Sequence, residues 1–159
     1  MALVAADLRD PRVLVACGFG SGFLPKAPGT WGSVVGVGLW LLIPGGLIWQ
    51  IGFCIGGLLL GSWLIESVCR RYRVDDEPAI VLDEIVGVWI ALLGTPFDIG
   101  WVLVGFVLFR VFDILKPWPI GWVDRKLKGG IGVMLDDVLA GLLALVVLKV
   151  SVFLIATYT

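Results

Sequence analysis

Carboxylate side chains occupy unusual places in this sequence, beside long apolar stretches. Two neighbouring pairs, Asp83-Glu84 and Asp136-Asp137, are each followed at once by aliphatic residues, and Asp113 lies near the end of another apolar stretch. Acidic side chains are costly to place in a membrane, and those found there usually serve a function. We therefore take these acids as the candidate catalytic and metal-binding residues.

An acidic cluster without histidine or cysteine ligands favours a hard cation. The chain has no histidine, and its three cysteines show no metal-ligand spacing. Oxygen donors select magnesium, calcium or manganese over zinc or copper. Magnesium commonly binds through one or two carboxylates and keeps water and phosphate oxygens as its other ligands. The sequence therefore predicts a magnesium-type site that can receive a phosphate group.

Basic and hydroxyl side chains near the acids are candidates for holding that phosphate. Arg110 and Lys116 lie one helical turn to either side of Asp113, and arginine can bind phosphate through two hydrogen bonds. Residues 25–33 (PKAPGTWGS) precede an apolar helix, and backbone amides at a helix start attract anions. The candidate donors in that segment are Lys26, Thr30 and Ser33.

These groups also have purely structural readings. Acids at a helix amino terminus gain about 0.3–1 kcal/mol from the helix dipole, which could account for either acidic pair. The helix dipole disfavours an acid at the position of Asp113, which lies near the carboxyl terminus of the predicted helix 101–115. Proline, Thr30 and Ser33 are common at helix starts, and Lys128 fits the general excess of basic residues in cytoplasmic loops.

The composition predicts a membrane protein. Of the 159 residues, 59% are hydrophobic and 16% are charged, against about 45–50% and about 25% in soluble domains. The mean hydropathy is +1.03, and no charged residue occurs between Ala27 and Ile65. The net charge of −1 gives no reason to expect a nucleic-acid partner. The length predicts one membrane-embedded domain, residues 1–159.

The apolar segments predict an all-α, polytopic helix bundle with four to five membrane-embedded helices. Backbone groups in lipid must be satisfied internally, and the unbroken apolar runs lack the alternation of barrel strands. A span needs roughly 20 residues, so the first segment is short enough to be re-entrant. The predicted helices cover residues 31–43, 47–67, 81–96, 101–115 and 133–157.

Lysine and arginine predict the orientation of this bundle. They concentrate before the first helix, after the second and after the fourth, whereas the turns at 44–46 and 94–100 contain none. The positive-inside rule then places the amino terminus and all the candidate acids on the cytoplasmic side. Trp118 and Trp122 are expected at headgroup depth, as an aromatic anchor.

Four blocks of sequence resemble the bacterial phosphatidylglycerophosphatase A family. They are residues 25–33, 79–90 (AIVLDEIVGVWI), 109–120 (FRVFDILKPWPI) and 134–141 (MLDDVLAG), in the family's order. Asp124 and Arg125 lie in a further similar stretch, WVDRKLKGG. Asp76 matches an acid of the family's polar loop, although this charged run also reads as a solvated surface. Leu82 stands where some relatives have an aromatic residue, which alters packing only.

The resemblance implies a magnesium-dependent, multi-pass enzyme of the bacterial inner membrane with its site facing the cytoplasm. Members hydrolyse phosphatidylglycerol phosphate to phosphatidylglycerol and inorganic phosphate in phospholipid biosynthesis. The resemblance also implies that the family's acidic positions are the five acids above and that its lysine is Lys116. It adds Asp124 and Arg125 to the candidate phosphate-binding residues. The sequence carries no signal for an oligomeric state.

Two other classes of function fit the same acids. A small ion-coupled transporter would place them near the membrane midplane, whereas they are predicted at one face. In a non-enzymatic assembly subunit they would pair structurally with Arg110 and Lys116.

Among phosphatases, the absence of histidine, of Cys-x5-Arg and of Asp-x-Asp leaves metal-assisted attack. Whether water, a carboxylate, Thr30 or Ser33 attacks the phosphorus, and which carboxylate is the base, stays open at this level.

Overall fold

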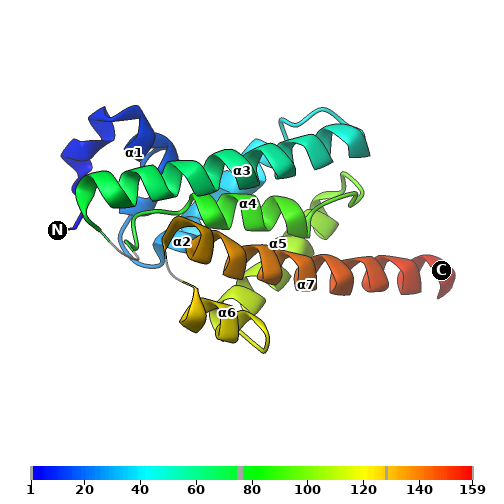
Figure 1. Ribbon diagram of the computed structural model, residues 1–159. Helices are drawn as coiled ribbons and strands as arrows, with labels where there is room; N and C mark the ends of the chain where they lie inside the picture. Colours follow the sequence, from blue (N-terminus) through cyan, green and yellow to red (C-terminus); the bar gives the residue numbers. More distant parts are fainter. Residues whose placement is uncertain (1, 75–76, 128, 159) are drawn as a thin grey trace.

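In a computed structural model, the chain is described for residues 2–74, 77–127 and 129–158. Every regular element in these ranges is helical, as predicted. Two 3-10 segments, Ala5–Arg9 and Gly18–Phe23, flank the short helix α1 (Pro11–Ala16). The remaining helices are α2 (Pro28–Trp40), α3 (Leu47–Tyr72), α4 (Leu82–Ala91), α5 (Ile99–Leu115), α6 (Ile120–Lys126) and α7 (Gly129–Tyr158), as Figure 1 shows.

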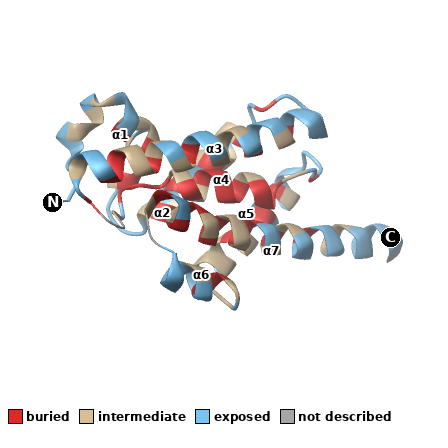
Figure 2. Ribbon diagram, viewed as in Figure 1, coloured by how far each residue is buried: buried red, intermediate tan, exposed pale blue. Residues whose placement is uncertain are grey.

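Helix α4 lies at the centre of the bundle, in contact with α2, α3, α5 and α7. Seven of its 10 residues are buried, and its ribbon is largely red in Figure 2. Two glycines allow its close approach to α7: a Cβ on Gly141 would lie 2.5 Å from the carbonyl oxygen of Gly87. Gly87 follows Asp83 by one turn, and Gly141 follows Asp137 by one turn. This packing therefore brings the two acidic pairs to the same level.

The helices alternate in direction, so one end of the bundle collects the acids. The starts of α2, α4 and α7 and the ends of α3 and α5 all line one cavity there, and we call this the carboxylate end. At the opposite end the backbone N–H of Gly94 donates to Gln50 Oε1 at 2.8 Å, and Lys149 Nζ donates to the carbonyl of Gly94. These bonds join the α4–α5 turn to both α3 and α7.

Helices α3 and α7 are long and apolar enough to cross a membrane. Only 22% of the most apolar window of each is buried inside the protein, so most of that apolar surface faces outward, as a lipid environment requires. In Figure 2 the carboxyl-terminal half of α7 is largely exposed. Helices α2, α4 and α5 have 13, 10 and 17 residues, whereas a span needs roughly 20. The larger number of membrane-embedded helices therefore stays a prediction.

Several predicted boundaries differ from the structure: α2 covers Pro28–Trp40 rather than 31–43, and α3 ends at Tyr72 rather than at 67. For two others the reason is identifiable. Helix α4 ends at Ala91 rather than at 96, because Gly94 has a left-handed φ of 62° and glycine in that conformation ends helices. Helix α7 begins at Gly129 rather than at 133, because Gly130 packs on α3 and its N–H donates to Glu66 Oε2 at 2.9 Å. Asp136 and Asp137 are therefore inside the helix, so the dipole of a first turn does not explain them.

The stretch from 116 to 132, predicted as a loop, contains α6, and the amino-terminal segment contains α1. Asp10 caps α1 by accepting from the N–H of Arg12 at 3.0 Å. The Arg12 guanidinium donates to Ser67 Oγ at 3.0 Å, and Arg71 pairs with Asp10 at 3.3 Å. The amino-terminal segment is thus fastened to the end of α3, next to the carboxylate end.

The glycine contact between α4 and α7 can be tested by adding one methyl group. Gly141→Ala should destabilise the protein by about 1–3 kcal/mol, because overpacking forces the backbones apart. The matched control is Gly38→Ala, since no atom lies within 4 Å of the corresponding Cβ on α2. Thermal unfolding in detergent, followed by circular dichroism, measures the difference. Equal unfolding temperatures for the two variants would contradict this packing argument.

Candidate active site

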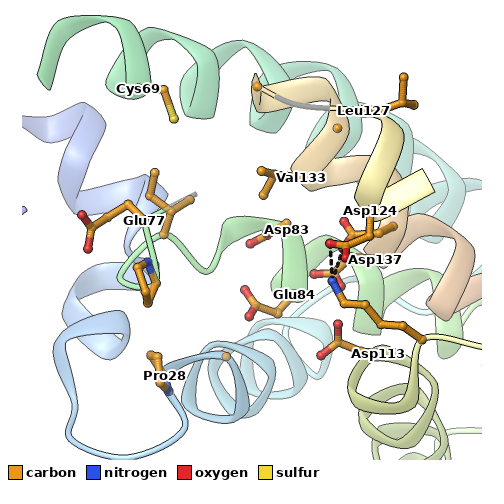
Figure 3. Close-up of a pocket in the computed structure, with 17 residues that line it drawn as sticks. Pro28, Cys69, Glu77, Asp83, Glu84, Asp113, Asp124, Leu127, Val133 and Asp137 are labelled. Atoms are coloured by element: carbon orange, nitrogen blue, oxygen red, sulfur yellow. Dashed lines mark hydrogen bonds and ion pairs between the residues drawn. The ribbon is translucent and has the colours of Figure 1, made fainter. Parts of the chain in front are cut away.

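A cavity of about 510 Å³ opens at the carboxylate end. Its walls come from α2, α3, α4, α5, α6 and α7 and from the segment before α4 (Figure 3). The five predicted acids line it, although three separate helices supply them. The charged residues of its lining are Glu77, Asp83, Glu84, Asp113, Lys116, Asp124, Asp136 and Asp137. The structure therefore brings together the acids that the sequence singles out.

Three of these carboxylates form an inner cluster. Asp83, Glu84 and Asp137 each place an oxygen within 4.8 Å of the others, and Figure 3 shows them around the same part of the cavity. Asp83 is 7% exposed and Asp137 is 3% exposed. Asp83 Oδ1 and Glu84 Oε2 are buried and have no hydrogen-bond partner among the described residues. The inner cluster thus presents unpaired acceptors to the cavity.

Burial and mutual repulsion oppose ionisation of this cluster. Desolvation raises the pKa of Asp83 well above its usual range, and the charge of Glu84 adds to the effect. Desolvation, followed by the charge of Asp137, raises the pKa of Glu84 to about 8, while Arg110 acts in the opposite direction. Neighbouring carboxylates stay ionised together only where a nearby positive charge compensates them. The inner cluster is therefore suited to a cation.

Arg110 and Asp113 form an ion pair beside the inner cluster. Arg110 Nη1 lies 2.7 Å from Asp113 Oδ2, and the side chains are 13% and 15% exposed. Arg110 also donates to Ser33 Oγ at 3.4 Å, while that hydroxyl donates to the carbonyl of Gly29 at 2.9 Å. Arg110 thereby connects the start of α2 to the end of α5.

Lys116 neutralises a second, outer part of the site. Its ammonium lies 2.6 Å from Asp124 Oδ1 and 2.7 Å from Asp136 Oδ2, the contacts drawn as dashed lines in Figure 3. Desolvation works against the charged form of Lys116. The hydrogen bonds and charges of the two carboxylates outweigh it and raise the pKa of Lys116 above its usual value. The outer acids thus have a cation from the protein, whereas no described lysine or arginine forms an ion pair with the inner cluster.

Two of the seven predicted phosphate-binding residues, Lys116 and Asp124, line the cavity, where Asp124 is a partner of Lys116. Ser33 and Arg110 lie behind the lining and contact it at Gly29 and Asp113. The other three, exposed Lys26, half-buried Thr30 and exposed Arg125, do not line the cavity either. Lys128 and Asp76 are outside the described residues.

Two positioning residues were not identified as such from the sequence. Glu66 accepts from the N–H of Gly130 and so fixes the start of α7, on which Asp136 and Asp137 lie. The sequence feature that could have identified Glu66 is an acid within an apolar helix, the same criterion that singled out the other acids. Gly29 is needed because a Cβ there would lie 2.1 Å from Glu84 Oε1.

The model of the family described as Phosphatidylglycerophosphatase A matches residues 14–152. The chain is 41% identical over 140 residues to the Escherichia coli K12 protein of that name, covering 86% of this chain and 81% of the relative. It is 45% identical over 144 residues to the Haemophilus influenzae protein of the same name, covering 89% and 88%. The chain belongs to the phosphatidylglycerophosphatase A family.

Membership in the phosphatidylglycerophosphatase A family confirms the resemblance and makes the protein a phosphatase. It therefore favours hydrolysis over ion transport and over a purely structural role for the acids. The chain is also 39% identical over 148 residues to a Bacteroides thetaiotaomicron protein, covering 87% of this chain and 92% of the relative. The name of that protein provisionally assigns it a phosphatidylinositol-3-phosphatase activity. No solved structure matches the chain.

The contact between Gly29 and Glu84 makes a sharp prediction. Gly29→Ala should displace the Glu84 carboxylate and lower phosphate release by about 100-fold, as misplacement by about 1 Å can do. Gly38→Ala, on the same helix but with open space around it, serves as the control. The measurement is phosphate release at equal protein, with helix content checked by circular dichroism. Full activity of Gly29→Ala would show that the Glu84 position is not critical.

Proposed function

We propose that this protein is a magnesium-dependent lipid phosphatase that removes the terminal phosphate of phosphatidylglycerol phosphate, giving phosphatidylglycerol and inorganic phosphate in phospholipid biosynthesis. One observation carries the proposal. Buried carboxylates with unpaired oxygens face a cavity that also contains an ammonium group, at one end of two apolar helices. The names of the Escherichia coli and Haemophilus influenzae relatives support the choice of lipid.

The donor chemistry fits a magnesium ion at the inner cluster. Asp83, Glu84 and Asp137 offer only oxygen ligands, with mutual separations within 4.8 Å, and magnesium prefers such ligands. Asp113 and Asp136 already have ion pairs with Arg110 and Lys116, so we place them around the ion as supporting acids. The ion would supply charge stabilisation for the phosphate and would make a bound water more acidic.

The residues of the chain have separate tasks in this mechanism. The Lys116 ammonium faces the cavity and donates to a phosphate oxygen, while Arg110 keeps positive charge behind Asp113. Phosphoryl transfer depends mainly on such positioning and electrostatics. A cavity-facing carboxylate accepts the proton of the attacking water, since the chain has no histidine. Thr30 and Ser33 do not line the cavity, which favours water over a hydroxyl nucleophile.

The lipid's position follows from the arrangement of the helices. With α3 and α7 in the bilayer, the carboxylate end lies at headgroup depth and the acyl chains remain among the apolar surfaces. Trp118 and Trp122 are 84% and 51% exposed near this end, where aromatic side chains anchor proteins in the interface. The basic residues of the same end support our proposal that it faces the cytoplasm and that the protein is a multi-pass protein of the bacterial inner membrane. We treat residues 1–159 as its one domain.

Neutralising single acids tests the site assignment. Asp83→Asn, Asp113→Asn and Asp137→Asn should each reduce phosphate release by at least about 100-fold, because each removes a charge that positions the ion or the phosphate. Asp98→Asn is the matched control: Asp98 caps α5 at the opposite end, and asparagine caps equally well. Purified protein and phosphatidylglycerol phosphate in mixed micelles provide the assay. Near-normal rates for all three site variants would overturn the assignment.

Removal of divalent metal tests the cofactor separately. Chelation should abolish phosphate release, and magnesium or manganese should restore it, because oxygen-only sites prefer hard cations. Manganese binding, followed by electron paramagnetic resonance, should be clear for the wild type and much weaker for Asp137→Asn. Parallel assays on phosphatidylinositol 3-phosphate and phosphatidic acid test the choice of lipid. Undiminished activity in chelator would contradict a metal-dependent mechanism.

A further inference from the structure

A second cavity, of about 520 Å³, runs along α3 away from the acids. One wall is α3 from Trp49 to Leu64, and the floor is one face of α4, formed by Leu82, Val86 and Trp89. All of these side chains are apolar except for the indole N–H of Trp89, which donates to the carbonyl of Gly36 at 2.8 Å. We call this cavity the α3–α4 groove.

The groove is open where glycines face it. At Gly52 and Gly56 no atom lies within 4 Å of the place where a Cβ would stand, so no protein side chain fills this part. The Phe53 and Trp89 rings meet edge to face nearby, with centroids 6.3 Å apart. Since most of the apolar window of α3 is not buried in the protein, the groove lies on a membrane-embedded surface.

The groove ends where the acidic cavity begins. On α4, Leu82 lines the groove and the next residue, Asp83, lines the cavity. On α3, Leu64 lines the groove and Cys69, little more than one turn further, lines the cavity. Two helices thus lead from an apolar channel directly to the site proposed for a phosphate.

We propose that the α3–α4 groove binds one acyl chain of the lipid whose phosphate lies in the acidic cavity, an inference that rests on the proposed function. Residues 52 to 64 cover about 18 Å of helix, close to the depth of one leaflet in a core of about 30 Å. The groove is lined by apolar side chains along this length and ends beside the acids, as an acyl chain attached to a headgroup in the acidic cavity requires.

The test blocks the groove without disturbing the backbone. Gly56→Leu places a side chain in the open part of the groove, and Gly38→Leu places the same side chain in open space on α2. Both variants are assayed on dioleoyl and on dihexanoyl phosphatidylglycerol phosphate. For Gly56→Leu, kcat/KM on the long-chain lipid should fall about 10-fold or more, because a chain kept out of the groove no longer holds its headgroup in position at the acids, and misplacement by about 1 Å can cost about 100-fold in rate. Its kcat/KM on the short-chain lipid, and both values for Gly38→Leu, should stay close to wild type.

Other results are equally decisive. Normal activity of Gly56→Leu on the long-chain lipid, or an equal loss on both lipids, would overturn the groove assignment. So would a shift of Gly56→Leu from dimer to monomer with both activities intact, because the groove would then be a contact between copies. If the wild type hydrolysed neither lipid, the proposed function would fail instead.

A direct binding measurement is independent of activity and of how well the variant folds. A phospholipid with a photoactivatable acyl chain should crosslink to Phe53, Leu60 or Leu64 in the wild type, and Gly38→Leu should give the same pattern. Crosslinks spread evenly over the lipid-facing surface of α7 instead would reject the groove as a specific site.

Discussion

Close packing of two helices forces like charges together, and the rest of the site depends on that constraint. Because α4 and α7 meet at Gly87 and Gly141, the acidic pairs one turn earlier cannot move apart without breaking the core of the bundle. Repulsion among Asp83, Glu84 and Asp137 is thus built into the fold. Under the proposed function a magnesium ion relieves this repulsion, so the same helix contact that brings the acids together gives the site its affinity for the ion.

The compensating charges are divided unevenly around the cavity. Lys116 and Arg110 neutralise the outer acids through short ion pairs, and both come from the last turns of α5 or its end. Among the described residues, the inner acids form no ion pair. Under the proposed function, the inner acids hold the ion, while Lys116, paired with acids in the outer part, donates to the phosphate.

Sequence reasoning singled out the five acids that line the cavity, because an acid in an apolar stretch is rare whatever the fold. It also found the five longer helices, since their apolar runs are unambiguous. It placed the start of α7 too late, because Gly129 and Gly130, which allow close packing on α3, look like a loop in the sequence. It also placed the end of α4 too late, because the conformation of Gly94 depends on contacts with Gln50 and Lys149. The roles of Thr30, Lys26 and Arg125 could not be judged from spacing, because spacing does not reveal whether these side chains face the cavity.

The hydrogen bonds that Gln50 and Lys149 make with Gly94 bear on how a lipid headgroup reaches the site. They join three segments at the end remote from the acids, whereas the residues that line the acidic cavity lie at the carboxylate end. Under the proposed function, the lipid headgroup enters the acidic cavity, and the released phosphate leaves it, through the same opening at the carboxylate end. A lipid phosphate in the other leaflet must therefore flip to the acidic side before this protein can act on it.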